Sequence, residues 1–357
     1  MKLRIFFFLL LVAPFSNAQE LRIGLFRSMD IKKLTLNVHQ GEYSVYGDSV
    51  NLGALREIEL DIHQGMIRVR INQEYLTFER FSIVQDTSNA SFKIRSLSPV
   101  SKQHYYTDNL ELSVVDCHFN LVNVLKMENY LSGVIESEGG GGRHMEYYKV
   151  QALMSRTYAL KNLDRHFEEG FHLCDGVHCQ AYHNMLRHTS SIKEAVEFTR
   201  NQVLVDLNNQ LVTSYFSANC GGQVCDASYV WNTSVPYVES FIDTFCVHTR
   251  QATWTTIIDK QKWDAFLEKQ YGVSEQKYGS DVYNFDQDER KAFFIHPSLG
   301  IPLRDIRKKF HLKSTFFNSR LKGGRVVLEG RGFGHGVGLC QEGAMRMAEL
   351  GYSYSQI

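Results

Sequence analysis

Alternating apolar and polar residues dominate the first third of the chain. Short runs with apolar residues at every second position are separated by Gly, Asp and Asn, which is typical of β-strands joined by tight turns. We expect strands in LRIGLF, KLTLNVH, EYSVYG, GMIRVRI, LTFERFSIV and SFKIRSL, with a further strand, LELSVVD, after residue 109. The pattern predicts a β-rich N-terminal domain over residues 19–108, and nothing in that domain has catalytic spacing.

The pattern changes to helical spacing in the stretch 130–160. Apolar residues from Tyr130 to Ile135 repeat at helical spacing up to Glu138, and four glycines at 139–142 then stop the helix. A second helix is predicted to start near Met145. Glu138 therefore lies at a helix end beside open backbone, where an apolar setting would suit a general acid. A solvated surface glutamate is the alternative interpretation.

The rest of the chain mixes both patterns. Residues 191–206 predict a helix followed by the strand QVLVDL, with NQLVTSYFSANCGG as its hairpin partner. Residues 249–325 predict a helix-rich span, in which KQKWDAFLEKQYG is amphipathic and Trp254 and Trp263 pack inside. A glycine-rich turn over 330–344 runs into a last helix, EGAMRMAEL. The fold class is α+β.

The N-terminus predicts export. Lys2 and Arg4 precede an apolar run over 5–12, and small residues at Ser16 and Ala18 follow, so residues 1–18 have the form of a secretory signal peptide. A buried N-terminal strand is the alternative. The apolar run is too short for a stable anchor. We expect a soluble periplasmic or cell-envelope protein with no membrane span in the mature chain.

The charge of the chain is balanced, with 39 basic and 39 acidic residues. This argues against a nucleic-acid partner, or an anionic membrane, held by bulk electrostatics. A polymeric partner would be neutral or of mixed charge.

Histidines and cysteines crowd into about twenty residues near the middle of the chain. A tetrahedral zinc there would take thiolates from Cys174 and Cys179, an imidazole from His178, and one from His166 or His172. A disulfide or free thiols are the alternatives.

The seven cysteines are an odd number for an exported protein. We expect one disulfide among Cys220, Cys225 and Cys246, and the sequence leaves the pair open.

Four segments together resemble the motif blocks of the SpoIID/LytB family of bacterial cell-wall proteins. They lie in the family's order: YLSGVIESEGGGGRHMEYYKVQALMSRTYAL (130–160), CDGVHCQAY (174–182), YFSANCGG (215–222) and GRGFGHGVGLCQEGA (330–344). The chain departs from the usual pattern at Gly139 and Gly140, where the family has Met and Pro, and at Cys340, where it has Ser. The resemblance implies a mixed α/β SpoIID-like catalytic domain over 109–357, with 249–325 as a helical insertion.

The resemblance also implies an activity. It points to a lytic transglycosylase that cleaves glycan strands of peptidoglycan, with Glu138 as the catalytic acid/base and a preference for strands without peptides. Some relatives carry zinc through the Cys-His motif, where the metal would be structural or regulatory. The matching substrate-binding candidates are Lys149, Gln151, Arg156, Gln180, Tyr182, Tyr215, Ser217, His335 and Gln341.

Two other functions stay open at the sequence level. The chain could be a non-catalytic glycan-binding module that stimulates a cell-wall amidase, as the LytB name suggests. It could instead be a zinc hydrolase using the Cys174 cluster, although no HExxH motif supports that. The family usually continues beyond the fourth block, and the sequence leaves open whether the chain continues after Ile357.

Overall fold

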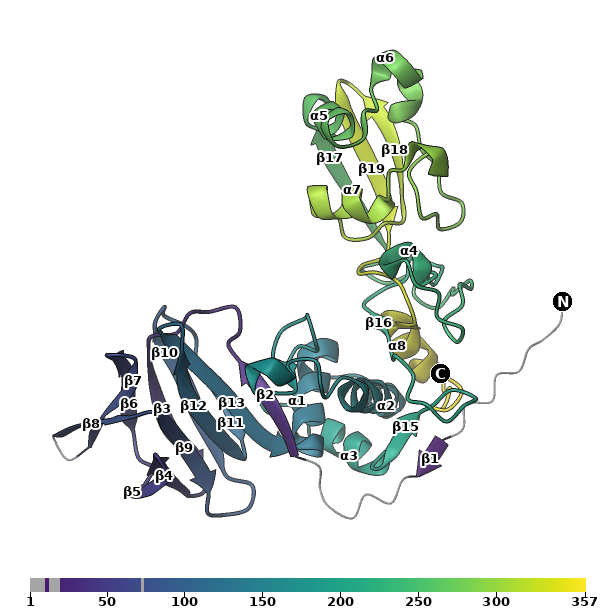
Figure 1. The fold of residues 1–357 in the computed structure, drawn as a ribbon. Helices are drawn as coiled ribbons and strands as arrows, with labels where there is room; N and C mark the ends of the chain where they lie inside the picture. Colours follow the sequence, from purple (N-terminus) through teal and green to yellow (C-terminus); the bar gives the residue numbers. More distant parts are fainter. Residues whose placement is uncertain (1–9, 13–19, 72–73) are drawn as a thin grey trace. The chain divides into compact units, whose positions relative to one another are not determined.

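The computed structural model describes residues 10–12, 20–71 and 74–357. The chain divides into two compact units, Met1–Thr213 and Ser214–Ile357 (Figure 1). Most of the predicted signal peptide lies outside the described residues, apart from strand β1 (Leu10–Val12). The unit boundary falls later than the predicted domain boundary at residue 109, because β12 and β13 continue the sheet of the N-terminal strands.

Two antiparallel sheets form most of the first unit. Their strand orders are β11-β10-β3-β6-β7-β8 and β14-β2-β13-β12-β9-β4-β5, in which only the short β14 pairs parallel to its neighbour. The strands are β2 (Glu20–Leu25), β3 (Lys33–Gln40), β4 (Tyr43–Gly47), β5 (Val50–Ala54), β6 (Ile58–His63), β7 (Met66–Ile71), β8 (Glu74–Phe78), β9 (Arg80–Gln85), β10 (Ser91–Ser98), β11 (His104–Thr107), β12 (Asn109–Val115), β13 (His118–Lys126) and β14 (Leu173–Cys174).

The predicted strands are present, with one difference. The run LTFERFSIV forms two strands, β8 and β9, which pair in different sheets on either side of Glu79. The alternating pattern buries one face of each strand, as in β10, where Phe92 and Ile94 are fully buried. Apolar faces of this kind give the β-rich part of the unit its core.

Three helices follow the sheets in the first unit: α1 (Met127–Gly139), α2 (Met145–Lys161) and α3 (Ser190–Phe198). Both helices predicted around the glycine run are confirmed. Gly140 ends α1 with φ 68°, a conformation that favours glycine. Gly133 lets α1 approach the loop after β14 closely, since a Cβ there would lie 2.4 Å from the Asn184 carbonyl oxygen. The unit closes with η1 (Phe167–Glu169) and β15 (Gln202–Leu204).

The second unit contains a three-stranded sheet of order β17-β19-β18 and a two-stranded parallel pair, β16-β20. The predicted hairpin between QVLVDL and residues 209–222 is wrong for its second half, because β16 pairs with β20 near the end of the chain. The elements are β16 (Phe216–Ser217), α4 (Ser228–Trp231), β17 (Thr253–Asp259), α5 (Lys260–Tyr271), α6 (Glu275–Tyr278), η2 (Gly279–Val282), η3 (Pro297–Leu299), α7 (Leu303–Phe310), β18 (Phe317–Lys322), β19 (Arg325–Arg331), β20 (Leu339–Cys340) and α8 (Gln341–Glu349).

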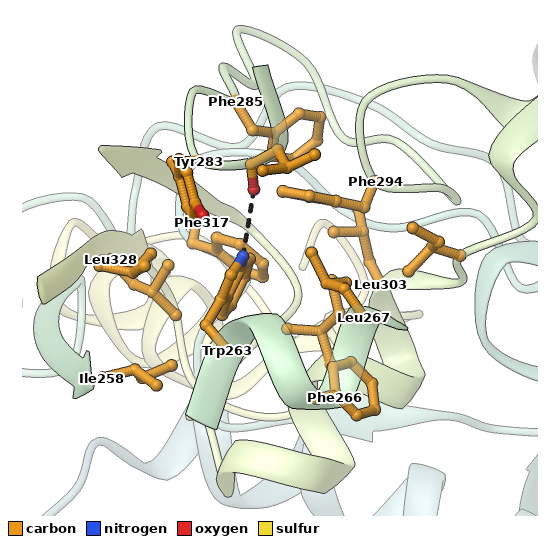
Figure 2. Close-up of a cluster of buried hydrophobic side chains, with 14 of the residues drawn as sticks. Ile258, Trp263, Phe266, Leu267, Tyr283, Phe285, Phe294, Leu303, Phe317 and Leu328 are labelled. Atoms are coloured by element: carbon orange, nitrogen blue, oxygen red, sulfur yellow. Dashed lines mark hydrogen bonds between the residues drawn. The ribbon is translucent and has the colours of Figure 1, made fainter. Parts of the chain in front are cut away.

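The span 249–325 shares an apolar core with β19, built where α5 and α7 pack on the β17-β19-β18 sheet (Figure 2). Trp263 is fully buried at its centre, and its indole N–H donates to the Val282 carbonyl at 3.1 Å. Trp254 is also buried, and it packs so closely on Gly330 that a Cβ there would lie 2.1 Å from the indole ring. The predicted packing of both tryptophans is confirmed.

The α+β fold class is confirmed, with a strand-rich N-terminal part and a mixed region after it. None of the helices in the described residues combines the length and apolar character needed to cross a membrane.

Candidate active site and metal centre

Glu138 lies in the last turn of α1, half-buried. Its Oε1 accepts a hydrogen bond from the Ala181 backbone N–H at 2.8 Å, and among the described residues no donor reaches Oε2. Burial raises the pKa of this carboxyl, while the Ala181 amide and nearby His183 oppose the rise. The group therefore keeps its proton at a higher pH than an exposed glutamate would, with one oxygen fixed and one open.

The end of α1 holds the loop 181–188 through backbone donors. His183 N–H donates to Ser137 Oγ at 3.2 Å, and Glu136 accepts from Arg187 N–H at 2.8 Å and from His188 N–H at 3.0 Å. Together with the Ala181 contact, three consecutive side chains of α1 bind one loop. This pattern fixes the loop relative to Glu138.

Both oxygens of Glu136 are therefore used in holding the loop. Glu136 is two residues from Glu138, but its carboxylate is not placed to act with it on one substrate. The local arrangement offers chemistry by a single carboxyl.

Four side chains form a cluster that could hold a metal ion: His166, Cys174, His178 and Cys179, whose ligand atoms all lie within 4.8 Å of one another. Cys179 Sγ is 3.4 Å from His166 Nε2 and 3.9 Å from His178 Nδ1. Two thiols and two imidazoles match the donors of a tetrahedral zinc site. The pKa of Cys174 is lowered chiefly by its hydrogen bond with Cys179, which favours the thiolate form that binds metal.

The surroundings of the cluster also fit a metal. His166 Nδ1 contacts Glu169 Oε1 at 2.5 Å, which directs Nε2 at the sulfur of Cys179. A carboxylate on the far nitrogen of a histidine is the usual outer partner of a zinc ligand. Arg27 in turn pairs with Glu169, and Arg165 contacts His178 Nε2 at 3.3 Å.

The structure selects between the two alternative histidine donors. His172 lies outside the cluster, where its Nδ1 accepts from the Arg22 backbone N–H at 3.1 Å. His172 is therefore corrected to a residue that ties the loop to β2, and His166 supplies the imidazole. The contact with Arg22 of β2 therefore keeps the His172 ring out of the cluster.

The segment 179–181 links the metal cluster to the candidate acid. Cys179 is a cluster member, and Ala181, two residues later, is the backbone donor to Glu138. Asp175, next to Cys174, accepts from the Phe26 backbone N–H at 2.5 Å and anchors the same loop to the sheet edge. A metal in this cluster would hold the segment that orients Glu138.

The predicted substrate-binding residues of the first unit divide into one partly exposed residue and four buried ones. Lys149 is partly buried and pairs with Glu146 at 2.6 Å. Arg156 is 3 % exposed and donates to the carbonyls of Val196, Thr199 and Gln202. These contacts give Arg156 a role in the fold, tying α2 to the end of α3.

Three further predicted residues are also inside. Gln151 is fully buried and contacts Ser155 Oγ at 3.3 Å, and Gln180 donates to the Ser155 carbonyl at 3.2 Å. Tyr182 is fully buried, with its hydroxyl donating to Asn123 Oδ1. Side chains at these depths act on the packing around Glu138, and direct substrate contact by them stays a prediction.

In the second unit, Tyr215 and His335 share an aromatic cluster with Trp231. Tyr215 stacks on Trp231 with ring centroids 4.3 Å apart, and Trp231 meets His335 at 5.2 Å. Trp231 is 40 % exposed and was not predicted from the sequence, since no motif flanks it. Flat, partly exposed rings of this kind suit the faces of sugars.

His335 is held in one orientation. Its Nδ1 accepts from the Val337 backbone N–H at 3.0 Å, and burial lowers the ring's pKa to about 4. The imidazole is therefore neutral near pH 7. Ser217 and Gln341, the remaining predicted residues, are each 6 % exposed.

A second group of possible metal ligands lies in the second unit, and the sequence did not reveal it. Cys220, Asp243, Cys246 and Cys340 are all buried, with ligand atoms within 4.8 Å of one another. The expected disulfide among Cys220, Cys225 and Cys246 is not formed, as all seven cysteines are free. Cys225 lies in a separate apolar cluster.

A broad hollow of about 870 Å³ lies elsewhere on the first unit, on the seven-stranded sheet. Its lining is of mixed charge, including Arg22, Arg80 and Glu111, and contains neither Glu138 nor a cluster ligand. We assign it no part in the chemistry.

Comparisons with known proteins agree with the motif pattern. Residues 116–205 match the family model described as SpoIID, Stage II sporulation protein. An uncharacterised protein of Brachyspira hyodysenteriae is 26% identical over 355 residues, covering 97% of this chain and 92% of that protein. Stage II sporulation protein D of Bacillus amyloliquefaciens is 26% identical over 77% of this chain and 80% of its own length.

A further relative carries a different name. The protein named Amidase enhancer of Bacillus subtilis is 26% identical over 64% of this chain, which spans only 38% of that protein. The expected resemblance to the SpoIID/LytB family is confirmed by these matches together.

Proposed function

We propose that this chain, as a relative of the SpoIID/LytB family, is a lytic transglycosylase that cleaves the bond between N-acetylmuramic acid and N-acetylglucosamine in peptidoglycan. The observation that carries the proposal is Glu138, a half-buried carboxyl with a raised pKa, one fixed oxygen and one open oxygen. The names of the Bacillus relatives support a role related to the cell wall.

The first half of the reaction uses Glu138 as an acid. Its proton passes from the open oxygen to the glycosidic oxygen, and the bond from that oxygen to C1 of the muramyl residue breaks. The raised pKa matters here because the carboxyl must be protonated at the pH of the reaction.

The second half uses Glu138 as a base. The muramyl C6 hydroxyl attacks C1, its proton passes to the carboxylate, and a 1,6-anhydro ring closes. No water is consumed, and Glu138 regains its proton. The Ala181 N–H, donating to Oε1 throughout, stabilises the carboxylate that forms between the two halves.

This scheme needs only one carboxyl, and the surroundings of Glu138 support a mechanism with a single carboxyl. Hydrolytic glycosidases pair two carboxylates several ångströms apart. The nearest candidate for a second one, Glu136, has both oxygens engaged by the Arg187 and His188 amides. The nucleophile in our scheme is the substrate's own hydroxyl.

Zinc is the metal that best fits His166, Cys174, His178 and Cys179, given the two thiols. Bound there, zinc would supply structural cross-linking. Because Gln180 connects Cys179 to Ala181, a fixed Cys179 would also hold in place the Ala181 N–H that donates to Glu138. The chemical step itself needs no metal.

We further propose that the protein is exported and works in the periplasm or cell envelope. The predicted signal peptide and the names of the relatives support this place of action. Because the chain has no excess of positive charge, glycan strands stripped of their peptides are the substrate that we favour.

The test is mass spectrometry of purified glycan strands, with and without prior peptide removal, after incubation with the protein. We expect anhydromuramyl products from the native protein and none from Glu138→Gln. Glu194→Gln, which changes an exposed glutamate on α3, is the matched control and should keep the activity. Reducing-end products would point instead to hydrolysis.

A non-catalytic role as an amidase enhancer is the second candidate, favoured by the name of the Bacillus subtilis relative. In that case neither the native protein nor Glu138→Gln would form anhydro ends. Both would still bind glycan strands and accelerate peptide release by a cell-wall amidase to the same extent.

A further inference from the structure

The second unit contains three thiols and a carboxylate that meet inside the fold. Cys220 follows β16, Asp243 and Cys246 belong to one turn, and Cys340 is the N-cap of α8. Asp243 Oδ2 is 3.2 Å from Cys220 Sγ, which is 3.4 Å from Cys246 Sγ. We propose that these four residues form a second, structural site for zinc or a similar thiophilic divalent cation.

The spacing of the sulfurs suits a metal better than a covalent bond. A disulfide needs its sulfurs about 2.05 Å apart. Sulfurs on a tetrahedron with zinc–sulfur bonds of about 2.3 Å lie roughly 3.8 Å apart. The Cys220–Cys246 separation of 3.4 Å is nearer to the second value. A disulfide would also leave Cys340 as an unused thiol beside it.

Backbone amides surround the sulfurs as they do around thiolate ligands. Cys340 Sγ accepts from Cys220 N–H at 3.3 Å and from Gly343 N–H at 3.4 Å, in the first turn of α8. N–H donors and a helix N-terminus stabilise negative sulfur, the form that binds metal.

The carboxylate of Asp243 is buried, and its Oδ1 accepts a hydrogen bond from the Phe245 backbone N–H at 2.9 Å. Asp243 is 8 % exposed, and none of the ion pairs in the described part of the chain includes it. A buried carboxylate without a cation is costly, and a divalent ion among the four ligands would neutralise it. Gly343 keeps this space open, since a Cβ there would lie 2.6 Å from Asp243 Oδ2.

The expected consequence is a cross-link between three segments of the second unit. The segments around Cys220, Cys246 and Cys340 are also joined by the short β16-β20 pair and by Asn219, which donates to the Cys246 carbonyl at 3.2 Å and to Glu342 at 2.7 Å. A metal here would fix the start of α8 against the turn at 243–246. The site is separate from the His166 cluster, which belongs entirely to the first unit.

Metal content of the purified full chain tests the proposal. After loading with zinc and removal of excess, we expect two equivalents in the native protein. The Cys174→Ser/Cys179→Ser variant should keep one, and Cys246→Ser/Cys340→Ser should also keep one. Cys225→Ser, a buried cysteine outside both clusters, is the matched control and should keep two.

Asp243→Asn guards against loss by misfolding, because it keeps the shape of the side chain. We expect it to fold and to lower zinc affinity at the second site by about tenfold or more. The intact mass of the denatured, unreduced protein should correspond to seven thiols. A mass lower by two hydrogens, located at Cys220 and Cys246, would overturn the proposal, and so would a single zinc equivalent that vanishes with Cys174 and Cys179.

Discussion

Replacing Arg156 with methionine separates a role in the fold from a role in binding. The guanidinium is 3 % exposed and donates to the Thr199 carbonyl at 2.8 Å and the Val196 carbonyl at 3.1 Å. Methionine fills much of the same volume but removes both charge-assisted bonds, so the Thr199 carbonyl retains the Gln202 N–H as donor and the Val196 carbonyl retains Thr199 Oγ1. Each bond from a charged donor contributes about 1.5–3 kcal/mol.

Two unfavourable features of the buried Arg156 side chain reduce the expected loss of stability. Burial lowers the pKa of Arg156 to about 10, and its buried Nε has no partner in the structure. Taking the lower end of the range for each bond, we expect Arg156→Met to destabilise the first unit by about 3 kcal/mol. For a unit of this size that corresponds to a fall in Tm of about 6–12 °C.

Thermal unfolding followed by circular dichroism, together with glycan-strand binding at a temperature where the variant is folded, tests this expectation. Arg200→Met is the control, because Arg200 is exposed and its pair with Glu197 contributes little. Binding should survive Arg156→Met. An unchanged Tm combined with lost binding would refute the reasoning and restore Arg156 as a substrate contact.

Three other predictions concern the acid, the metal cluster and the aromatic cluster. Anhydro product formation should fall as pH rises through the raised pKa of Glu138, since the protonated form starts the reaction; a rate that instead rises with pH would contradict this role. Glu138→Gln should be at least as stable as the native protein near pH 7, because it removes a buried charge. Glu169→Gln should weaken zinc binding at the His166 cluster by about 10–100-fold in a chelator competition, and an unchanged affinity would mean that Glu169 does not orient the imidazole. Trp231→Ala should weaken glycan-strand binding by about 1–2 kcal/mol in calorimetry, whereas equal binding would remove the ring pair with Tyr215 from the glycan surface.

The helices around Glu138 could be predicted from the sequence because their signals are local. Apolar residues at helical spacing and a run of glycines placed the end of α1 within a residue or two, and the start of α2 at Met145. Strands with a buried face were found for the same reason. The strands β5, β6 and β11 were not predicted: VNLGA in β5 carries little alternation, whereas IELDIH in β6 alternates strictly and could have been predicted.

The roles of polar residues were harder to predict, because they depend on contacts between distant segments. The motif predicts Gln151 and Arg156 as ligand-binding residues, yet tertiary packing buries both side chains. The meeting of Cys220 with Cys340, 120 positions later, follows from the β16-β20 pairing and leaves no local signal. The choice of His166 over His172 likewise depends on distant contacts, since His172 binds the Arg22 backbone N–H and His166 contacts Cys179.

The hydrogen bonds between α1 and the loop 181–188 determine which substitutions the loop can accept. The side chains of Glu136, Ser137 and Glu138 bind only backbone N–H groups of that loop. As far as these four bonds are concerned, the exposed side chains of the loop, His183, Arg187 and His188, are free to change without moving the carboxyl. Proline alone, which lacks the N–H, is barred at positions 181, 183, 187 and 188. Substitutions in this loop can thus change the surface beside Glu138 while the position of its carboxyl is kept.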